Sequence, residues 1–380
     1  MPKRYFLLLL LTLNSCIDLY DKKYTFDTNL ISIEGLLTDK DPFFVIIKQS
    51  RSTQRTEFSQ PVSRATVELL AGNNTRTLLT ESFTTPGRYE APANFRGVVN
   101  QAYRLRIRLA DNRVYESSLE RLTATPPMTN ITQEFNQTGI KDNEGIVLTS
   151  SVDVFIDTQD NPQETNFYRW RTFLYENQRV CATCLNGEWN VRNNECRAYR
   201  LDPEPNPPIV TDYECDRRCW QVYDDTRFNI FSDVLTNGAS ISKRLVRQVP
   251  FYLENPGALL IVEQMCISPT IYRYFDVLKQ QTETTGTLTD VPPAPPIGNM
   301  RNVNNPEEIV LGYFSAAGIT RNSVWIDRSQ YAGATSTTQL GGREPIFEPN
   351  DPYTSLPKFF KVTCGSLRGQ TPIAPPGWRF

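Results

Sequence analysis

The chain contains no histidine among its 380 residues. A Ser-His-Asp or Cys-His catalytic relay therefore cannot be built, and zinc sites that use histidine ligands are excluded as well. General acid–base chemistry would fall to carboxylates, lysine or tyrosine. We therefore expect a binding or structural protein, not an enzyme, and the sequence assigns no catalytic residue, metal site or cofactor.

Long apolar runs are scarce, and so is net charge. The one clear run near the start, residues 6–11, is far shorter than the roughly 20 residues that a membrane-spanning helix needs. The formal net charge is −2, which gives no electrostatic reason to expect nucleic-acid binding.

The first sixteen positions indicate export and lipid attachment. Residues 1–5 are basic, residues 6–11 are apolar, and a small residue precedes Cys16. This order is typical of a secretory signal peptide over residues 1–15. A cysteine directly after the cut is the bacterial lipoprotein arrangement, and two or more acyl chains hold a protein stably at a membrane. We expect lipidated Cys16 to begin a polar tether over residues 16–28; a plainly secreted protein cut at the same place is the alternative.

Seven further cysteines remain, and five of them fall within residues 181–219. Disulfides are the default in an exported protein, and the odd count leaves one thiol over. The disulfide candidates are Cys181, Cys184, Cys196, Cys215, Cys219, Cys266 and Cys364. A Cys₄ zinc site from Cys181-x₂-Cys184 and Cys215-x₃-Cys219 has plausible spacing, but an oxidising compartment favours disulfides.

The pattern of the chain predicts a mostly β protein with two domains. Short alternating segments fill residues 29–122, and one of them, residues 103–109, has strict period two. About seven such strands predict an Ig-like β-sandwich over residues 29–124. Prolines 126 and 127 mark the boundary. A larger β-rich domain follows over residues 125–380, with a Cys-rich insertion at 176–225.

One amphipathic helix is predicted over residues 269–284. Ser268 is a good N-cap, and Pro269 suits the first turn. An apolar stripe follows at helical spacing, made of Ile271, Tyr274, Phe275 and Leu278. We expect the helix to support the second domain structurally.

Some residues could bind a ligand or carry chemistry. Trp189 and Trp220, in the Cys-rich segment, could stack on sugars in binding loops or pack as a small core beside the disulfides. The acidic pairs of a carboxylate-based hydrolase would be Asp157-x₂-Asp160 and Asp224-Asp225, and turn or surface roles are the alternative. The terminal Trp378-Arg379-Phe380 follows several prolines and is expected to be a docked tail.

Two blocks of sequence resemble one bacterial family. The first contains Ile33-Glu34-Gly35 and Val62-Ser63-x-Ala65-x-Val67. The second contains Tyr272-x-Tyr274-Phe275-x₂-Leu278-x₂-Gln281, Gly286-x-Leu288, Pro292-Pro293, Gly298-Asn299, Asn305-Pro306-x-Glu308 and Leu311-Gly312-Tyr313-Phe314. With the lipoprotein start, these resemble the Bacteroidota outer-membrane lipoproteins catalogued as domain of unknown function 4249, over nearly the whole mature chain.

The resemblance implies a place and a kind of partner, but no activity. Members of that family are often encoded beside TonB-dependent outer-membrane receptors, which implies an accessory or binding role at such a receptor or another envelope complex. We expect a lipid-anchored protein of the outer membrane, on either its periplasmic or its cell-surface face. A glycan- or ligand-capturing surface lipoprotein is the alternative.

Overall fold

The structure is a computed structural model of the 380-residue chain. It describes residues 30–52, 57–73, 75–142, 145–178, 180–181, 183–190, 195–199, 210–212, 219–225, 227–251, 257–283, 296–331, 346–347, 364 and 368–379. These residues form a mostly β protein with one α-helix, as the sequence predicts.

The first sheet contains eleven strands among the described residues, in the order β22-β8-β7-β4-β5-β6-β2-β1-β23, with β3 beside β2 and β9 beside β7. The strands are β1 (Ile31–Thr38), β2 (Phe44–Ser52), β3 (Glu57–Pro61), β4 (Thr66–Ala71), β5 (Arg76–Glu81), β6 (Arg88–Glu90), β7 (Ala102–Arg108), β8 (Val114–Ser117), β9 (Glu120–Arg121), β22 (Met300–Asn302) and β23 (Val310–Ala317). Neighbouring strands are antiparallel except β1 and β23, which run parallel.

This sheet is a nearly closed barrel and not the clear Ig-like sandwich that the sequence predicted. Its two end strands, β22 and β23, are consecutive in the chain, and an antiparallel bridge joins Ile297 to Leu311 beside them. The predicted alternation of β7 is confirmed: Leu105 and Ile107 are fully buried in the barrel core. Closure follows because the twisted sheet recruits two late strands that the sandwich prediction did not include.

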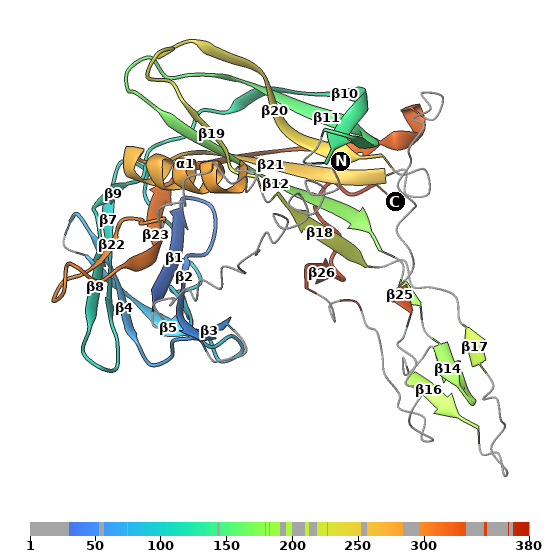
Figure 1. The fold of residues 1–380 in the computed structure, drawn as a ribbon, viewed down its shortest axis with the longest axis horizontal. Helices are drawn as coiled ribbons and strands as arrows, with labels where there is room; N and C mark the ends of the chain where they lie inside the picture. Colours follow the sequence, from blue (N-terminus) through green and yellow to red (C-terminus); the bar gives the residue numbers. More distant parts are fainter. Residues whose placement is uncertain are drawn as a thin grey trace, which may run out of the picture.

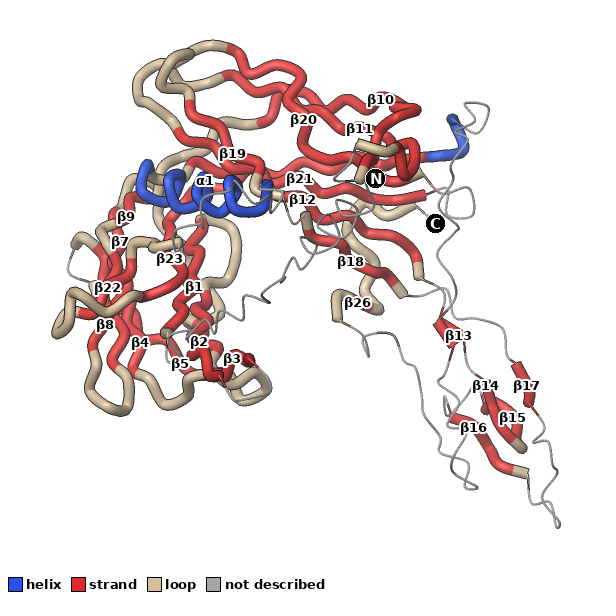
Figure 2. The backbone as a smooth tube through the Cα atoms, in the orientation of Figure 1, coloured by secondary structure: helices blue, strands red, loops and turns tan. Residues whose placement is uncertain are grey.

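The second part of the molecule, here called the two-sheet body, packs a small sheet on a larger one (Figure 2). The small sheet has the order β10 (Met128–Lys141), β11 (Val147–Gln159) and β20 (Ser240–Pro250). The larger sheet has the order β24-β21-β12-β18-β26, with β19 beside β12. Its strands are β12 (Phe167–Asn177), β18 (Trp220–Asp224), β19 (Asn229–Ser232), β21 (Gly257–Cys266), β24 (Ile319–Asp327) and β26 (Gln370–Thr371). One apolar core, which includes Val154, Trp170 and Leu260, fills the space between the sheets.

The barrel and the two-sheet body are joined by a nearly continuous strand. β23 belongs to the barrel and β24 to the larger sheet, with only Gly318 between them. A Cβ at Gly318 would approach the carbonyl oxygen of Thr123 to 2.6 Å, so only glycine fits this crossing of two chains. The barrel therefore combines residues from both sides of the predicted boundary at residue 124.

The helix α1 (Pro269–Glu283) lies where the barrel meets the two-sheet body (Figure 1). The amide of Ile271 donates to Oγ of Ser268 at 3.3 Å, as an N-cap should. Ile271, Tyr274 and Phe275 are buried, as the predicted stripe requires. Their cluster includes Leu36 of the barrel and Ile230 of the two-sheet body. A 3₁₀ turn (Arg328–Tyr331) follows β24, and no helix in the described ranges is long and apolar enough to cross a membrane.

The Cys-rich segment contributes small two-stranded sheets. They pair β13 (Val180–Cys181) with β25 (Ile346–Phe347), β14 (Thr183–Leu185) with β17 (Val210–Asp212), and β15 (Gly187–Asn190) with β16 (Glu195–Ala198). Figure 1 shows β14, β16 and β17 at the end of the molecule remote from the barrel.

Candidate functional site

A cavity of about 490 Å³ lies between the barrel wall and the larger sheet of the two-sheet body. We call it the junction pocket. The barrel contributes Glu34, Leu36, Phe44, Ile46, Arg88 and Tyr313, and the larger sheet contributes Arg171, Phe173, Glu263 and Arg321. The two sequence stretches that contain Glu34 and Tyr313 are among those that resemble the family, so the fold brings them together at this pocket.

Strand alternation places these side chains in the pocket. In β1, Ile33 and Gly35 point into the barrel core, so Glu34 and Leu36 point outward. In β12, Thr172 and Leu174 are buried toward the space between the two sheets, so Arg171 and Phe173 face the other way. The pocket is therefore the space between the outer face of a barrel and the outer face of a sheet.

A buried carboxylate organises the charges of the pocket floor. Glu263 accepts hydrogen bonds from Nη2 of Arg171 at 2.6 Å and from Nε of Arg321 at 2.7 Å. Arg321 also pairs with Asp41, which belongs to the barrel. Burial by itself would lower the pKa of Arg321, but the hydrogen bond to Asp41 and the charge of Glu263 outweigh it and raise this pKa. The guanidinium stays charged and connects the two parts of the molecule.

The rim of the pocket carries charges of both signs. The guanidinium of Arg88 lies 3.5 Å above the ring of Phe44, and its Nε is 2.6 Å from Oε1 of Glu90. Glu34 is exposed, and among the described residues it makes no ion pair. The rim therefore offers an exposed carboxylate beside a half-buried guanidinium, which is paired with Glu90 and stacked on an aromatic ring.

Several contacts fix the two walls relative to each other. Oδ1 of Asp39, in the barrel, accepts the amide of Ile319 at 2.9 Å. Arg169 is half-buried, with its guanidinium 3.8 Å from the ring centroid of Phe275 and its Nη1 3.5 Å from the hydroxyl of Tyr313. Because apolar packing and hydrogen bonds both cross this junction, the pocket is preformed, which reduces the ordering cost of binding.

Trp220 does not contribute to the junction pocket. It is only 3% exposed and packs edge-on against Trp378 at 5.8 Å, which in turn packs against Trp325 at 5.0 Å. The expected docked tail is confirmed at Trp378, and the buried indole of Trp220 has no free face for a sugar. The side chain of Trp189 lies outside the described residues.

Two of the predicted disulfide cysteines pair with each other. Cys219 and Cys364 form a disulfide with a Cα–Cα distance of 5.5 Å, across 145 residues of sequence. Cys266 is a free, buried thiol, and burial raises its pKa to about 12. The lipidation residue Cys16, the whole of Cys215 and the side chains of Cys181, Cys184 and Cys196 lie outside the described residues, so cross-linking of the 181–219 segment stays a prediction.

The acids suggested by the sequence contact neighbouring strands or face solvent. Asp157 accepts the amide of Lys243 at 2.6 Å, and Asp225 lies 3.5 Å from Nη1 of Arg247. Asp224 is exposed. Asp157 and Asp225 thus each hold a residue of β20, which favours the structural alternative for these acids.

Sequence reasoning missed a buried acid pair, Asp160 with Asp233. Asp160 accepts the hydroxyl of Tyr168 at 2.5 Å and the amide of Gly238 at 2.6 Å. Burial and the adjacent Asp160 raise the pKa of Asp233 to about 6, against the opposing effect of the Asn166 amide. The pair fixes the loop between β19 and β20. No local signal could reveal it, because the partners are remote in sequence.

Together these features define a mostly β protein of two joined parts with a pocket at their junction. Residues 17–323 match the family described as a domain of unknown function, DUF4249, and the chain belongs to this family. No curated protein matches the chain. Among solved structures, a DUF4785 family protein from Legionella pneumophila subsp. pneumophila str. Philadelphia 1 is similar at 10% identity and a TM-score of 0.20, over 62% of this chain and about half (52%) of that one.

Proposed function

We propose that this protein is a lipid-anchored accessory or binding subunit of the bacterial outer membrane, and that its partner is a TonB-dependent receptor or another envelope barrel protein. The signal peptide and Cys16 support the anchor. The resemblance to Bacteroidota outer-membrane lipoproteins, and the family's genetic neighbourhood, support the partner. The proposal assigns no chemical reaction.

The junction pocket is the observation that carries a binding role. Its floor is fixed by Arg171 and Arg321 around Glu263, and its rim presents Glu34 and Arg88. A preformed pocket between two joined parts of a protein is a common location for ligand or peptide binding. We propose that a segment of the partner, carrying charges of both signs, binds here.

The test is purification of the tagged full-length protein from outer membranes in a mild detergent. The wild type is compared with Glu34→Lys combined with Arg88→Glu, which reverses both rim charges. The matched control is Glu164→Lys, an exposed acid that does not line the pocket. Wild type and control should retain the same barrel protein, and the pocket variant should lose it.

Two outcomes would contradict the proposal. If no barrel protein accompanies the wild type in repeated preparations, the accessory role is wrong. If the partner stays with the double variant as well as with the control, the junction pocket is not its binding site.

A further inference from the structure

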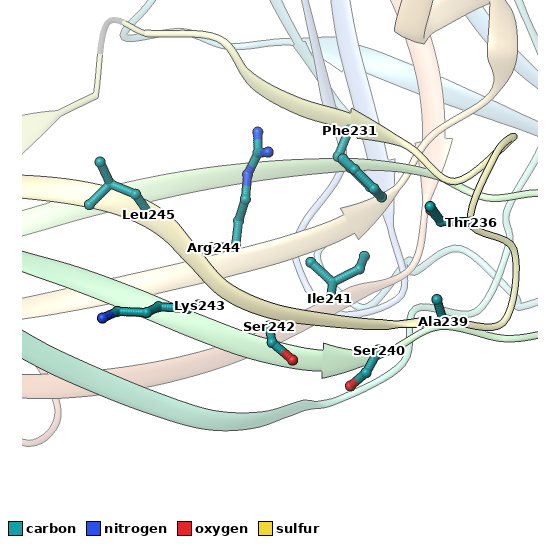
Figure 3. Close-up of a pocket in the computed structure, with 9 residues that line it drawn as sticks. All are labelled: Phe231, Thr236, Ala239, Ser240, Ile241, Ser242, Lys243, Arg244 and Leu245. Atoms are coloured by element: carbon teal, nitrogen blue, oxygen red, sulfur yellow. The ribbon is translucent and has the colours of Figure 1, made fainter.

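A second region of charge lies on the two-sheet body, around Arg244 of β20. Two cavities meet at this residue and at Leu245, one of about 600 Å³ and one of about 160 Å³. Figure 3 shows the larger one, where the side chains of Arg244 and Ile241 project from β20 to the side on which Phe231 of β19 lies, and those of Ser240 and Ser242 project to the other side. Lys279 of α1 lines the smaller cavity.

Arg244 is a half-buried cation without a carboxylate. Its Nη2 donates to Oδ1 of Asn229 at 2.7 Å and to the carbonyl of Ile230 at 3.0 Å, and both acceptors are neutral. Among the described residues no acid lies within ion-pair distance of it. Burial lowers the pKa of Arg244. The rings of Trp170 and Phe231 at 5.2 and 5.7 Å offset part of the lost hydration.

The surrounding charges are also unbalanced toward positive. Arg227 and Arg247 both pair with one carboxylate, that of Asp225, each at 3.5 Å. Lys279 makes no ion pair within the part of the chain that the structure describes. The lining of the smaller cavity thus carries three cations, Arg227, Arg244 and Lys279, and one acid, Asp225. This excess of positive charge attracts an anion.

A β-bulge directs Arg244 into this region. Ile156 of β11 pairs with Arg244 and Thr158 pairs with Ile241, so two residues of β20 oppose one residue of β11. Within the bulge, Lys243 has a φ of 52°, in the left-handed region that is unfavourable for lysine. The carboxylate of Asp157 accepts the Lys243 amide at 2.6 Å and holds this conformation. Figure 3 shows Lys243 and Arg244 pointing in different directions, and such bulges re-aim side chains at functional sites.

We propose that the cavities around Arg244 bind a phosphate or sulfate group carried on a hydroxylated, sugar-like ligand. Nη1 of Arg244 donates to neither Asn229 nor Ile230, so it can donate a charge-assisted hydrogen bond to an anion. Lys279, which lines the smaller cavity, adds a second positive charge. The larger cavity supplies the hydroxyl of Thr236 and the apolar surfaces of Phe231 and Ile241 for the uncharged part of the ligand. This site is separate from the junction pocket and does not depend on a barrel partner.

The ligand could be free or the headgroup of a glycolipid, and one experiment distinguishes these sources. The full chain with Cys16→Ser is used throughout, so that its own acyl chains do not cause vesicle binding. Glucose 6-phosphate is titrated by calorimetry, with glucose as the uncharged control. Vesicles of phosphatidylcholine with lipid A are compared with pure phosphatidylcholine vesicles in a sedimentation assay. Saturable binding to glucose 6-phosphate alone identifies a free ligand, and saturable binding to the lipid A vesicles identifies a lipid-linked one.

Variants test whether Arg244 is responsible. Arg244→Gln should weaken binding by about tenfold or more, because a charge-assisted hydrogen bond is lost, and Arg244→Lys should be intermediate. Lys279→Gln should weaken binding several-fold without changing the fold. Arg301→Gln, an exposed cation on β22, should bind like the parent chain.

The proposal is overturned if neither the sugar phosphate nor the lipid A vesicles bind saturably. It is also overturned if binding survives unchanged in both Arg244→Lys and Lys279→Gln, which keeps the test decisive even where Arg244→Gln fails to fold. Circular dichroism and a thermal melt establish folding for each variant.

Discussion

The side chain of Asn299 makes both main-chain hydrogen bonds of Phe314. Its Oδ1 accepts the Phe314 amide at 2.9 Å, and its Nδ2 donates to the Phe314 carbonyl at 2.8 Å. Nδ2 is also 2.9 Å from Oε1 of Glu120, a buried carboxyl. The Asn299 side chain thus makes the hydrogen bonds that a neighbouring strand would make to β23. Because Asn299 directly precedes β22, these bonds connect β22 with β23 at the point where the barrel would otherwise be open.

Asn299→Ala should therefore destabilise the protein. It leaves the two main-chain groups of Phe314 and Oε1 of Glu120 without this partner, and an unsatisfied buried group costs about 1–3 kcal/mol. Asn299→Asp should be worse at neutral pH, since it places a second carboxylate beside Glu120. Urea denaturation measures both, with the exposed Asn305→Ala as the control. Equal midpoints for Asn299→Ala and the control would show that this seam does not stabilise the barrel.

Local structure could be predicted from the sequence where short-range physics decides it. The N-cap at Ser268 and the stripe that includes Phe275 lie within one turn or two of each other, so their spacing predicts the helix directly. The alternation of apolar and polar residues in β7 likewise predicts which face of this strand is buried. Both predictions are confirmed.

The barrel and the candidate sites depend on residues that are remote in sequence. The parallel pairing of Ile31 with Val310 has no local signature, so the strands within residues 29–122 by themselves predict a sandwich. The junction pocket requires Glu34 to meet Arg321 across that same pairing. Likewise, the sequence singles out Asp157 as a candidate acid, but the residues next to it do not indicate that its carboxylate stabilises the bulge at Lys243.

Phe275→Ala should cost about 3–5 kcal/mol, as removal of a buried aromatic ring usually does. Its ring contacts Phe228, Tyr274 and Tyr313, so the cavity would open where the barrel meets the two-sheet body. Lys279→Gln on the same helix should leave the melting temperature nearly unchanged. Thermal denaturation compares the two, and an unaltered melt for Phe275→Ala would show that the helix does not support this junction.

Stability should depend on pH through Asp233. The folded protein raises its pKa from 3.8 to about 6, so folding favours the protonated form. This contribution is fully present below the ordinary pKa and is lost as pH rises through about 6. Asp233→Asn should remove that part of the pH dependence, which is measured as unfolding free energy from acid to neutral pH.

The exposed Asp224→Asn is the matched control for that series, because it makes the same Asp-to-Asn change at a surface position. The control should follow the wild-type curve. Glu120, whose pKa burial also raises, contributes with the same sign in all three proteins. If the unfolding free energies of wild type and Asp233→Asn change with pH in the same way, the folded protein does not raise the pKa of Asp233, and this prediction is wrong.

Cys16→Ser should move the protein from the membrane fraction to the soluble fraction, because the acyl chains would be absent. Cell fractionation and the mass of the N-terminal peptide measure the change, with the wild type processed in parallel. Unchanged membrane retention, together with an N-terminal peptide that carries no lipid in the wild type, would exclude lipidation at this position.

The most direct test of the binding role is photo-crosslinking in living cells from a photoreactive residue at position 34, on the rim of the junction pocket. A residue at position 164, exposed on the two-sheet body, serves as the reference. We predict that position 34 yields a defined adduct with an outer-membrane barrel protein and that position 164 does not. The absence of an adduct from position 34, or the same adducts from both positions, would contradict the assignment of this protein as an accessory subunit that binds its partner through the junction pocket.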